Sequence, residues 1–293
     1  MIEINKEIKQ KKYDSIPRIN HPDLENAFHA NDCVFVMEKL DGANASFMVD
    51  KKGNLKAFSR NTELDETEGL RGFYDWVHAN INPLHLTKSY VYFGEWLVKH
   101  KLRYGQNENQ FYLFDVYNVE KDRYESLESI IHENRYLNIP LAPIFYIGPY
   151  KNEDFINQFV GKSILGEQGE GIVVKKYYGQ QIFAKVVAEK FIEVKPQKDP
   201  IPSTEMEATY IKNNLTKARV EKELYKLVDE GIVPEKFYLE EMSLILRHIG
   251  KRVHDDILKE EQPPDGIDFK TTQKFCGKLI PNIVKEIILE SRK

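Results

Sequence analysis

Short apolar or aromatic runs, bounded by polar turn residues, recur from Cys33 to about Lys198. Their length and spacing predict β-strands at residues 33–37, 45–49, 55–58, 90–93, 111–114, 171–174 and 182–184. Helical spacing of apolar residues over about 70–80 and 127–136 predicts helices between them. The pattern therefore indicates an α+β domain built from antiparallel sheets and helices.

The first two predicted strands flank the sequence Glu38-Lys39-Leu40-Asp41-Gly42. Gly42 accepts a positive φ and Asp41 tolerates the left-handed region, so the pair predicts a tight hairpin turn. Lys39 would then end a buried strand and face a cleft. Its amine could act as a nucleophile there if desolvation or nearby cations lowered its pKa. These five residues alone leave an ordinary hairpin open.

Prolines mark a boundary near residue 200. Three of them lie between Lys195 and Pro202, which predicts a linker. Beyond it every signal is helical. Thr204 and Glu207 form a capping box at the start of one helix, Gly231 ends the next, and Pro234 can start a long helix that runs towards Glu261. Asp268 could cap a last helix, which is kinked or restarted at Pro281. We expect two domains. The first covers residues 1–200, of which 1–30 form a loose N-terminal arm, and the second is a helical domain over 203–293.

Composition narrows the class of protein. With 293 residues, 41% hydrophobic and 30% charged, the chain is typical of a globular protein with a substantial core. Its net charge of -4 argues against a broadly basic nucleic-acid binder. Charges nearly cancel over residues 203–293, with 16 Lys and Arg against 17 Asp and Glu, so we expect no polyanion face there. Because Cys33 and Cys276 lie far apart and no apolar run has the length of a membrane span, we expect a cytoplasmic protein without a disulfide framework.

Charged or aromatic residues at the ends of three predicted strands are candidates for binding a ligand. Arg60 follows one strand, where its planar donors suit a phosphate, although a surface arginine is the simpler alternative. Glu95 follows an aromatic run and a glycine that permits close approach of a ligand. Phe114 could stack on a base, and alternation predicts that Asp115 lies on the opposite face of the strand.

The stretch around Glu170 is the most informative. Its carboxylate lies between two glycines at the start of a buried strand, which suits a hard divalent cation near phosphates, or an ordinary polar turn. A dense lysine cluster follows, with Lys175, Lys176, Lys185, Lys190, Lys195 and Lys198. A lysine nucleophile, phosphate-binding cations and carboxylates for metal and ribose are the parts needed for covalent nucleotidyl transfer.

The order of these motifs resembles the covalent nucleotidyltransferase superfamily of ATP-dependent ligases and messenger-RNA capping enzymes, and within it the RNA ligase 2 family. The matching stretches are residues 38–42, 59–60, 93–95, 111–116, 170–175 and 185–191. Tyr13-Asp14-Ser15 also resembles the family's Tyr-x-Ser. The resemblance implies an ATP-grasp-like nucleotidyltransferase domain followed by a small all-helical domain.

The resemblance further implies an RNA ligase that uses ATP with Mg²⁺ or Mn²⁺. Lys39 would attack the α-phosphate of ATP, AMP would pass to an RNA 5′-phosphate, and a 3′-hydroxyl would displace it. The implied nucleotide-binding residues are Glu38, Asp41, Gly42, Arg60, Glu95, Phe114 and Lys185, with Glu170 at the metal and Tyr13, Lys175 and Lys190 as contacts to phosphate or RNA. The expected partner is RNA with 5′-phosphate and 3′-hydroxyl ends, bound by a monomer.

The chain departs from the family pattern at three places. Val187 stands where the phage prototype has a second lysine, Asp41 replaces a histidine, and residues 96–100 lack the prototype's small, glycine-rich sequence. A DNA ligase or a capping guanylyltransferase is the alternative within the superfamily, although both usually carry a C-terminal β-barrel. A noncatalytic nucleotide- or RNA-binding module on a ligase scaffold is the alternative from another class.

Overall fold

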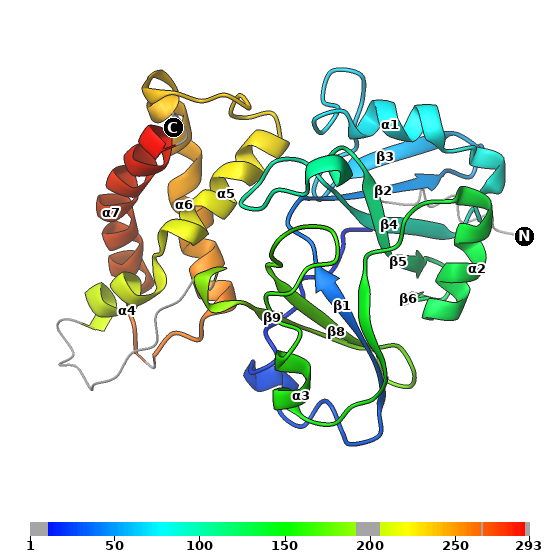
Figure 1. Ribbon diagram of the computed structural model, residues 1–293. Coiled ribbons are helices and arrows are strands. Elements are labelled where there is room, and N and C mark those ends of the chain that lie inside the picture. Colours follow the sequence, from blue (N-terminus) through cyan, green and yellow to red (C-terminus); the bar gives the residue numbers. More distant parts are fainter. Residues whose placement is uncertain (1–10, 192–205, 265, 291–293) are drawn as a thin grey trace, which may run out of the picture. The chain divides into compact units, whose positions relative to one another are not determined.

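The computed structural model describes residues 11–191, 206–264 and 266–290 and divides into two compact units (Figure 1). We call Met1–Ala188 the N-terminal unit and Glu189–Lys293 the helical unit. The linker expected around residues 195–202 and the capping residue Thr204 lie outside the described residues.

Two antiparallel sheets form the N-terminal unit. The first has the strand order β7-β1-β8-β9 and the second β3-β2-β4-β5-β6. The strands are Cys33–Lys39 (β1), Ala43–Val49 (β2), Leu55–Ser59 (β3), Tyr90–Trp96 (β4), Phe111–Asn118 (β5), Arg123–Tyr124 (β6), Ile144–Pro149 (β7), Gly171–Lys176 (β8) and Ile182–Val187 (β9). The helices are Phe73–Asn80 (α1), Leu127–Leu137 (α2) and Glu153–Asn157 (α3). The α+β class is confirmed; β6, β7 and α3 were not predicted.

The predicted hairpin at Asp41-Gly42 is wrong. Strands β1 and β2 belong to different sheets, because β1 pairs with β7 and β8 while β2 pairs with β3 and β4. Gly42 has no left-handed φ; instead, a Cβ atom on it would lie 2.5 Å from the carbonyl oxygen of Trp96. Glycine is therefore required by close backbone approach, and the segment after Lys39 carries the chain from one sheet to the other.

Each face of the β1 sheet packs differently. Val34 and Val36 on one face join Ile156 of α3 in a small core. Phe35, which points to the opposite face, joins the larger core that also contains Phe93 and the α1 residue Phe73. Alternation along β1 thus gives one face to α3 and leaves Phe35, Met37 and Lys39 on the other.

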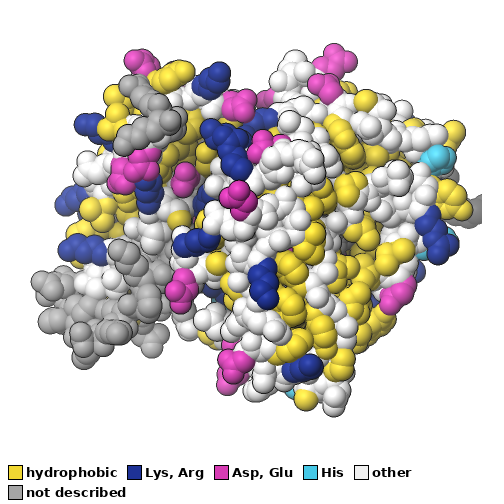
Figure 2. Space-filling model, viewed as in Figure 1, with side chains coloured by type: hydrophobic (Ala, Val, Ile, Leu, Met, Phe, Trp, Pro, Cys, Tyr) yellow, Lys and Arg dark blue, Asp and Glu magenta, His cyan; other side chains and the backbone are white. Residues whose placement is uncertain are grey.

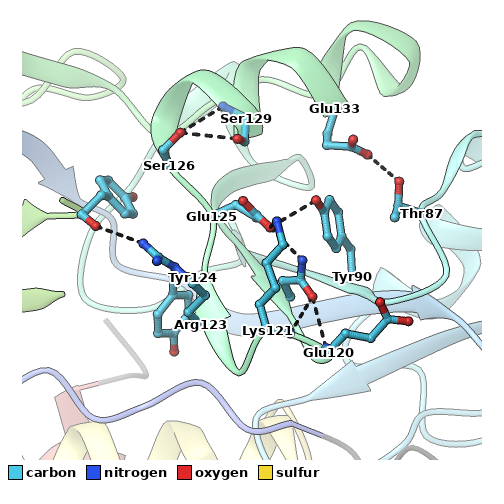
Figure 3. A network of polar contacts seen from close by, with 12 residues as sticks. Thr87, Tyr90, Glu120, Lys121, Arg123, Tyr124, Glu125, Ser126, Ser129 and Glu133 are labelled. Carbon is cyan, nitrogen blue, oxygen red and sulfur yellow. Dashed lines mark hydrogen bonds and ion pairs between the residues drawn. The ribbon is translucent and has the colours of Figure 1, made fainter. Parts of the chain in front are cut away.

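A polar network fixes α2 to the second sheet (Figure 3). The Glu125 carboxylate accepts hydrogen bonds from the Tyr90 hydroxyl at 3.1 Å and the Asn118 amide at 2.8 Å. Ser126 caps α2 by accepting from the backbone N–H of Ser129, and farther along α2 Glu133 accepts from Thr87 at 3.0 Å. Satisfied buried polar groups of this kind specify one arrangement of helix and sheet.

The segment of the predicted N-terminal arm between Tyr13 and Ile19 is not loose. Tyr13 is buried, and the backbone N–H of Ile19 donates to the Lys185 carbonyl at 3.0 Å. The Lys185 N–H donates to the Pro17 carbonyl at 2.9 Å, so this segment docks on β9 through an isolated parallel bridge between Arg18 and Lys185.

In the helical unit the described elements are Met206–Asn214 (α4), Lys217–Asp229 (α5), Met242–Glu260 (α6) and Phe269–Glu290 (α7). The stop at Gly231 (φ 70°) and the cap at Asp268 are confirmed. The start at Pro234 is wrong, because α6 begins at Met242 after a 3₁₀ turn, and α7 continues through Pro281 without restarting. Among the described residues, no helix is long and apolar enough to cross a membrane.

Candidate active site

Lys39 and Glu170 form an ion pair at one end of the β1 sheet. Lys39 ends β1 and is paired with Gly171, the first residue of β8, so the residue before that strand lies beside the amine. The Lys39 Nζ donates to the Glu170 carboxylate, and the two side chains are 26% and 10% exposed. Desolvation favours the neutral amine, but the nearby carboxylates, Glu170 first, outweigh it and raise the pKa of Lys39 above its usual value. The amine is protonated in the free protein.

Glu95 is the second carboxylate of this cluster. It lies near the end of β4, and its Oε1 accepts a hydrogen bond from the Gly42 N–H at 3.0 Å. Burial raises the pKa of Glu95 to about 7, although Lys39, His100 and the Gly42 N–H act in the opposite direction. At neutral pH this carboxyl group is therefore poised between its two protonation states.

Glu38 and Asp41 brace loops around the lysine. Glu38 accepts from the Ser163 hydroxyl and from the Ile164 N–H at 2.9 Å. Asp41 accepts from the Leu102 N–H at 2.7 Å. Their carboxylates are buried and engaged by the protein, which favours a role in holding the loops rather than direct contact with a nucleotide.

Strand register places Val187 directly across the sheet from Lys39. Lys39 pairs with Gly171 and Gly171 with Val187, so all three share a row and a face. Lys185 lies two residues along β9 on the same face, roughly 7 Å from that row. Glycine is required at position 171 by close backbone approach, because a Cβ there would lie 2.1 Å from the Val186 carbonyl oxygen.

A second lysine–carboxylate pair, Lys175 and Asp115, lies deeper on this face. The Lys175 Nζ donates to Asp115 at 2.6 Å and to the Phe114 carbonyl at 3.0 Å, and the two side chains are 2% and 0% exposed. The hydroxyls of Tyr177, at 2.7 Å, and Tyr13 also donate to Asp115. The placement of Tyr13 and Lys175 favours a structural role over direct contact with phosphate or RNA.

Phe114 and Asp115 do not lie on opposite faces, so that prediction is wrong. The β4–β5 register shifts between Phe93 and Gly94, which makes Phe114 an extra, bulged residue. The centroid of its ring lies 4.9 Å from the centroid of the Tyr13 ring and 5.2 Å from the Lys175 Nζ. Tyr13 and Lys175 also donate hydrogen bonds to Asp115. The buried network therefore supports Phe114 from below.

The two remaining predicted residues, Arg60 and Lys190, belong to different units. The Arg60 guanidinium, at the end of β3, is half-buried and donates to the Ser15 hydroxyl at 3.2 Å. Lys190 is exposed and belongs to the helical unit, where its amine lies 5.0 Å from the Phe191 ring. The contacts of the N-terminal unit bring together Lys39, Glu170, Glu95, Glu38, Asp41 and Gly42, but not Lys190.

Sequence reasoning missed four residues that shape the site. Tyr104, through its hydroxyl, accepts from the Asp41 N–H at 2.9 Å, and His100 lies 3.9 Å from the Asp41 carboxylate. Tyr177 and Ser163 complete the contacts of Asp115 and Glu38. None has a local motif, because each acts through a partner more than 50 residues away in the chain.

The described residues contain no group of three or more His, Cys, Asp or Glu side chains that could hold a metal ion alone. Glu170 and Glu95 provide two carboxylates near Lys39, close enough for each to influence the pKa of the lysine or of the other. That set fits Mg²⁺, which protein sites commonly bind through one or two carboxylates together with substrate phosphates.

The lysine, its carboxylates and the ends of the two antiparallel sheets form the candidate site of the N-terminal unit. The RNA ligase family model matches residues 32–187, more than half of the chain. The chain therefore belongs to the RNA ligase family, and its predicted resemblance to RNA ligases is confirmed. No curated protein matches the chain.

Similar solved structures include Naegleria gruberi RNA ligase. Its structure with PPi is 21% identical, with a TM-score of 0.47, and the match covers 65% of this chain and 60% of that one. The structure of a mutant with ATP and Mn is 21% identical, with a TM-score of 0.46, and that of a mutant with AMP and Mn is 20% identical, with a TM-score of 0.47. Each of these two matches covers 63% of this chain and 58% of the other one. This chain thus spans less than two thirds of the length of those chains.

Proposed function

We propose that the protein is an ATP-dependent RNA ligase that joins 5′-phosphate and 3′-hydroxyl ends through a Lys39–AMP intermediate and an AMP-capped 5′ end. The observation that carries the proposal is the Lys39 amine, partly exposed beside Glu170 and Glu95 at the end of a sheet. Family membership supports a ligase; the chemistry and the end specificity are our proposal.

In the first step the neutral Lys39 Nζ attacks the α-phosphorus of ATP. A P–N bond forms, the bond to the leaving pyrophosphate breaks, and the amine loses its proton. In the free protein this proton lies on the Lys39 Nζ, which donates it in a hydrogen bond to the Glu170 carboxylate, so Glu170 is the adjacent group that can accept it. When the pair weakens, burial becomes the dominant influence and lowers the pKa of Lys39 towards the range in which the amine attacks.

ATP and Mg²⁺ or Mn²⁺ are the proposed cofactors. Glu170, with Glu95 nearby, would hold the metal, and a bound divalent cation supplies positive charge that stabilises the phosphoryl oxygens. Phe114 stacks on the adenine, Glu95 contacts the ribose, and Lys185 contacts the α-phosphate. Arg60 binds the nucleotide or the 5′-phosphate of the strand.

Two further steps complete the joining reaction. The RNA 5′-phosphate displaces Lys39 from AMP, so the P–N bond breaks and a pyrophosphate linkage forms. The 3′-hydroxyl then attacks the RNA phosphorus, forms the phosphodiester and releases AMP. Residues 1–200 act as the adenylyltransferase domain and 203–293 as a helical accessory domain. RNA repair, the monomeric state and the cytoplasmic location stay predictions.

Covalent labelling by ATP tests the first step. Wild-type protein incubated with α-³²P-ATP and Mg²⁺ should carry label after denaturing electrophoresis, and Lys39→Ala should lose at least about 10³-fold of it. Lys52→Ala, an exposed lysine elsewhere in the N-terminal unit, is the matched control and should label normally. Equal labelling of Lys39→Ala and wild type would refute the assignment of Lys39.

A sealing assay separates the ligase from its alternatives. Nicked and single-stranded RNA with 5′-phosphate ends should be joined, and an AMP-capped strand should accumulate when the 3′-hydroxyl is missing. Preference for GTP over ATP would indicate a capping enzyme, and sealing confined to DNA would indicate a DNA ligase. Label on Lys39 without any sealing would favour the noncatalytic module, for which the apolar Val187 in the row of Lys39 is the supporting observation.

A further inference from the structure

Helix α7 carries a one-sided distribution of charge. From Phe269 to Lys285 it contains four lysines and no acidic residue. All four side chains are exposed, at Lys270, Lys274, Lys278 and Lys285. At 100° per residue their spacings of 4, 4 and 7 place them within about 80° of one another, so they form one stripe.

This stripe lies away from the packed side of the helix. The buried residues of α7 are Thr272, Cys276, Ile280, Val284, Ile287 and Ile288, and they face the core of the helical unit. The exposed residues between the lysines are uncharged, namely Gln273, Gly277 and Asn282. Figure 2 shows Lys and Arg side chains along the edge of this unit where α7 lies.

Asp268, Glu286 and Glu290 are the acidic residues that flank the stripe along the chain. The hydrogen bond from Thr271 and, to a smaller extent, the charge of Lys270 lower the pKa of Asp268. Asp268 accepts from the backbone N–H groups of Lys270 and Thr271 and from the Thr271 hydroxyl, and so caps the helix. Glu286 and Glu290 both pair with Lys217 of α5. Among the described residues, no carboxylate forms an ion pair with the four stripe lysines. The balanced charge count of residues 203–293 therefore conceals a row of exposed lysines on α7.

We infer that the α7 stripe, Lys270, Lys274, Lys278 and Lys285, binds the phosphate backbone of RNA. The inference rests on the proposed function and extends it by naming where, outside the Lys39 site, the RNA substrate is held. The argument is charge complementarity: the lysines span roughly 22 Å along a rigid helix, and a phosphate backbone is a line of negative charges on a comparable scale. Lysine supplies point charges without base recognition, so binding is independent of sequence.

The inference predicts a specific salt dependence. Each phosphate neutralised on a single strand contributes about 0.7 to the slope of log affinity against log salt, so four contacts contribute about 3. Raising monovalent salt from about 50 to about 200 mM should then weaken the α7-dependent binding roughly 50-fold. A duplex would give a somewhat steeper slope, about 0.9 for each contact.

The test compares the full-length protein with a variant in which all four stripe lysines become Gln. Fluorescence anisotropy with 5′-phosphorylated single-stranded RNA and with nicked duplex RNA should show binding weakened at least about tenfold and a slope reduced by about 3. The matched control replaces four other exposed lysines by Gln, at Lys52, Lys88, Lys236 and Lys251, and should bind like wild type. Thermal melting confirms that both variants are folded.

Labelling by ATP is measured on the same proteins. Normal Lys39 labelling of the stripe variant, together with weakened RNA binding, supports the inference. Unchanged RNA binding or slope in that variant overturns it and leaves the ligase proposal standing. If the wild type takes no label, but the stripe variant binds RNA more weakly than the wild type does, then the ligase proposal fails and the inferred RNA-binding surface stands. Loss of binding to phosphatidylserine vesicles, with RNA binding unchanged, would assign the stripe to a membrane surface and overturn the inference.

Discussion

Two lysine–carboxylate pairs lie on the same face of the β1 sheet and differ in almost every physical respect. Lys39 pairs with Glu170 at the open end of the sheet, with side chains 26% and 10% exposed. Lys175 pairs with Asp115 at 2% and 0% exposure, under the rings of Phe114 and Phe183. Desolvation acts on both amines. It lowers the pKa of Lys175 despite Asp115, whereas Glu170 and the other nearby carboxylates raise the pKa of Lys39.

The two pairs join the same kinds of group, a lysine amine and a carboxylate, so it is the exposure of the amine that distinguishes the proposed nucleophile Lys39 from the structural Lys175. The Asp115 carboxylate also accepts two tyrosine hydroxyls, so its pair belongs to a closed network with no room for a substrate. Glu170 accepts a hydrogen bond from the Lys39 amine, and that amine is partly exposed at the end of the sheet. The closed pair supports Phe114, while the open pair contains the amine that we propose as the nucleophile.

The largest expected effect comes from breaking the closed pair. Lys175→Ala leaves the Asp115 carboxylate buried without its cation and should cost about 3–5 kcal/mol of unfolding free energy. Lys39→Ala at the more exposed pair should cost roughly 1 kcal/mol or less. Both tryptophans, Trp76 and Trp96, lie in the N-terminal unit, so urea unfolding followed by tryptophan fluorescence reports on this unit. Similar losses for the two variants would contradict the comparison.

The strands that carry both pairs could be predicted from sequence, whereas part of their arrangement could not. Apolar runs bounded by turns identified β1, β4, β5, β8 and β9. The crossing after Lys39 was misread as a hairpin because the turn preference of Asp41-Gly42 is local, while the contact that requires Gly42 comes from Trp96, more than 50 residues away. Pairing partners at such separations leave no mark in a local pattern.

The bulge at Phe114 could not be predicted from the sequence for the same reason, because it depends on pairing with a distant strand. Strict alternation places Phe114 and Asp115 on opposite faces, and only the register of β5 against β4 reveals the extra residue. On α7, by contrast, the lysine spacing was visible in the sequence, but a net charge count discarded the positions of the charges. Position, rather than composition, was the missing information.

The next prediction concerns the pH dependence of the open pair. Because carboxylates raise the pKa of Lys39, only a small neutral fraction exists near pH 7, and this fraction rises tenfold for each pH unit below that pKa. The rate of Lys39 labelling under single-turnover conditions should therefore rise up to tenfold per unit between about pH 6 and about pH 8. A rate that stays flat while tryptophan fluorescence reports a folded protein would show that the amine is already neutral.

The smallest expected effect is a change in stability at Glu95. Burial raises the pKa of Glu95 to about 7 in the folded protein, whereas the unfolded chain releases this proton near 4.3. Between these values the folded state binds more protons, so raising the pH removes stability. Glu95→Gln keeps an acceptor for the Gly42 N–H but does not titrate, so its Tm relative to wild type should rise by several degrees between about pH 5 and about pH 8.

Glu125→Gln is the matched control, because its shift has the opposite sign. Burial alone would raise the pKa of Glu125, but hydrogen bonds from Asn118, Tyr90 and Lys121 prevail and lower it. A lowered pKa gives stability that is present at neutral pH and lost as the pH falls, so this variant should lose Tm relative to wild type as the pH rises. If both variants moved in the same direction, burial would not be the main influence on Glu95 at the Lys39 end of the sheet. The proposal that burial lowers the pKa of Lys39 once its pair with Glu170 weakens would then lose its support.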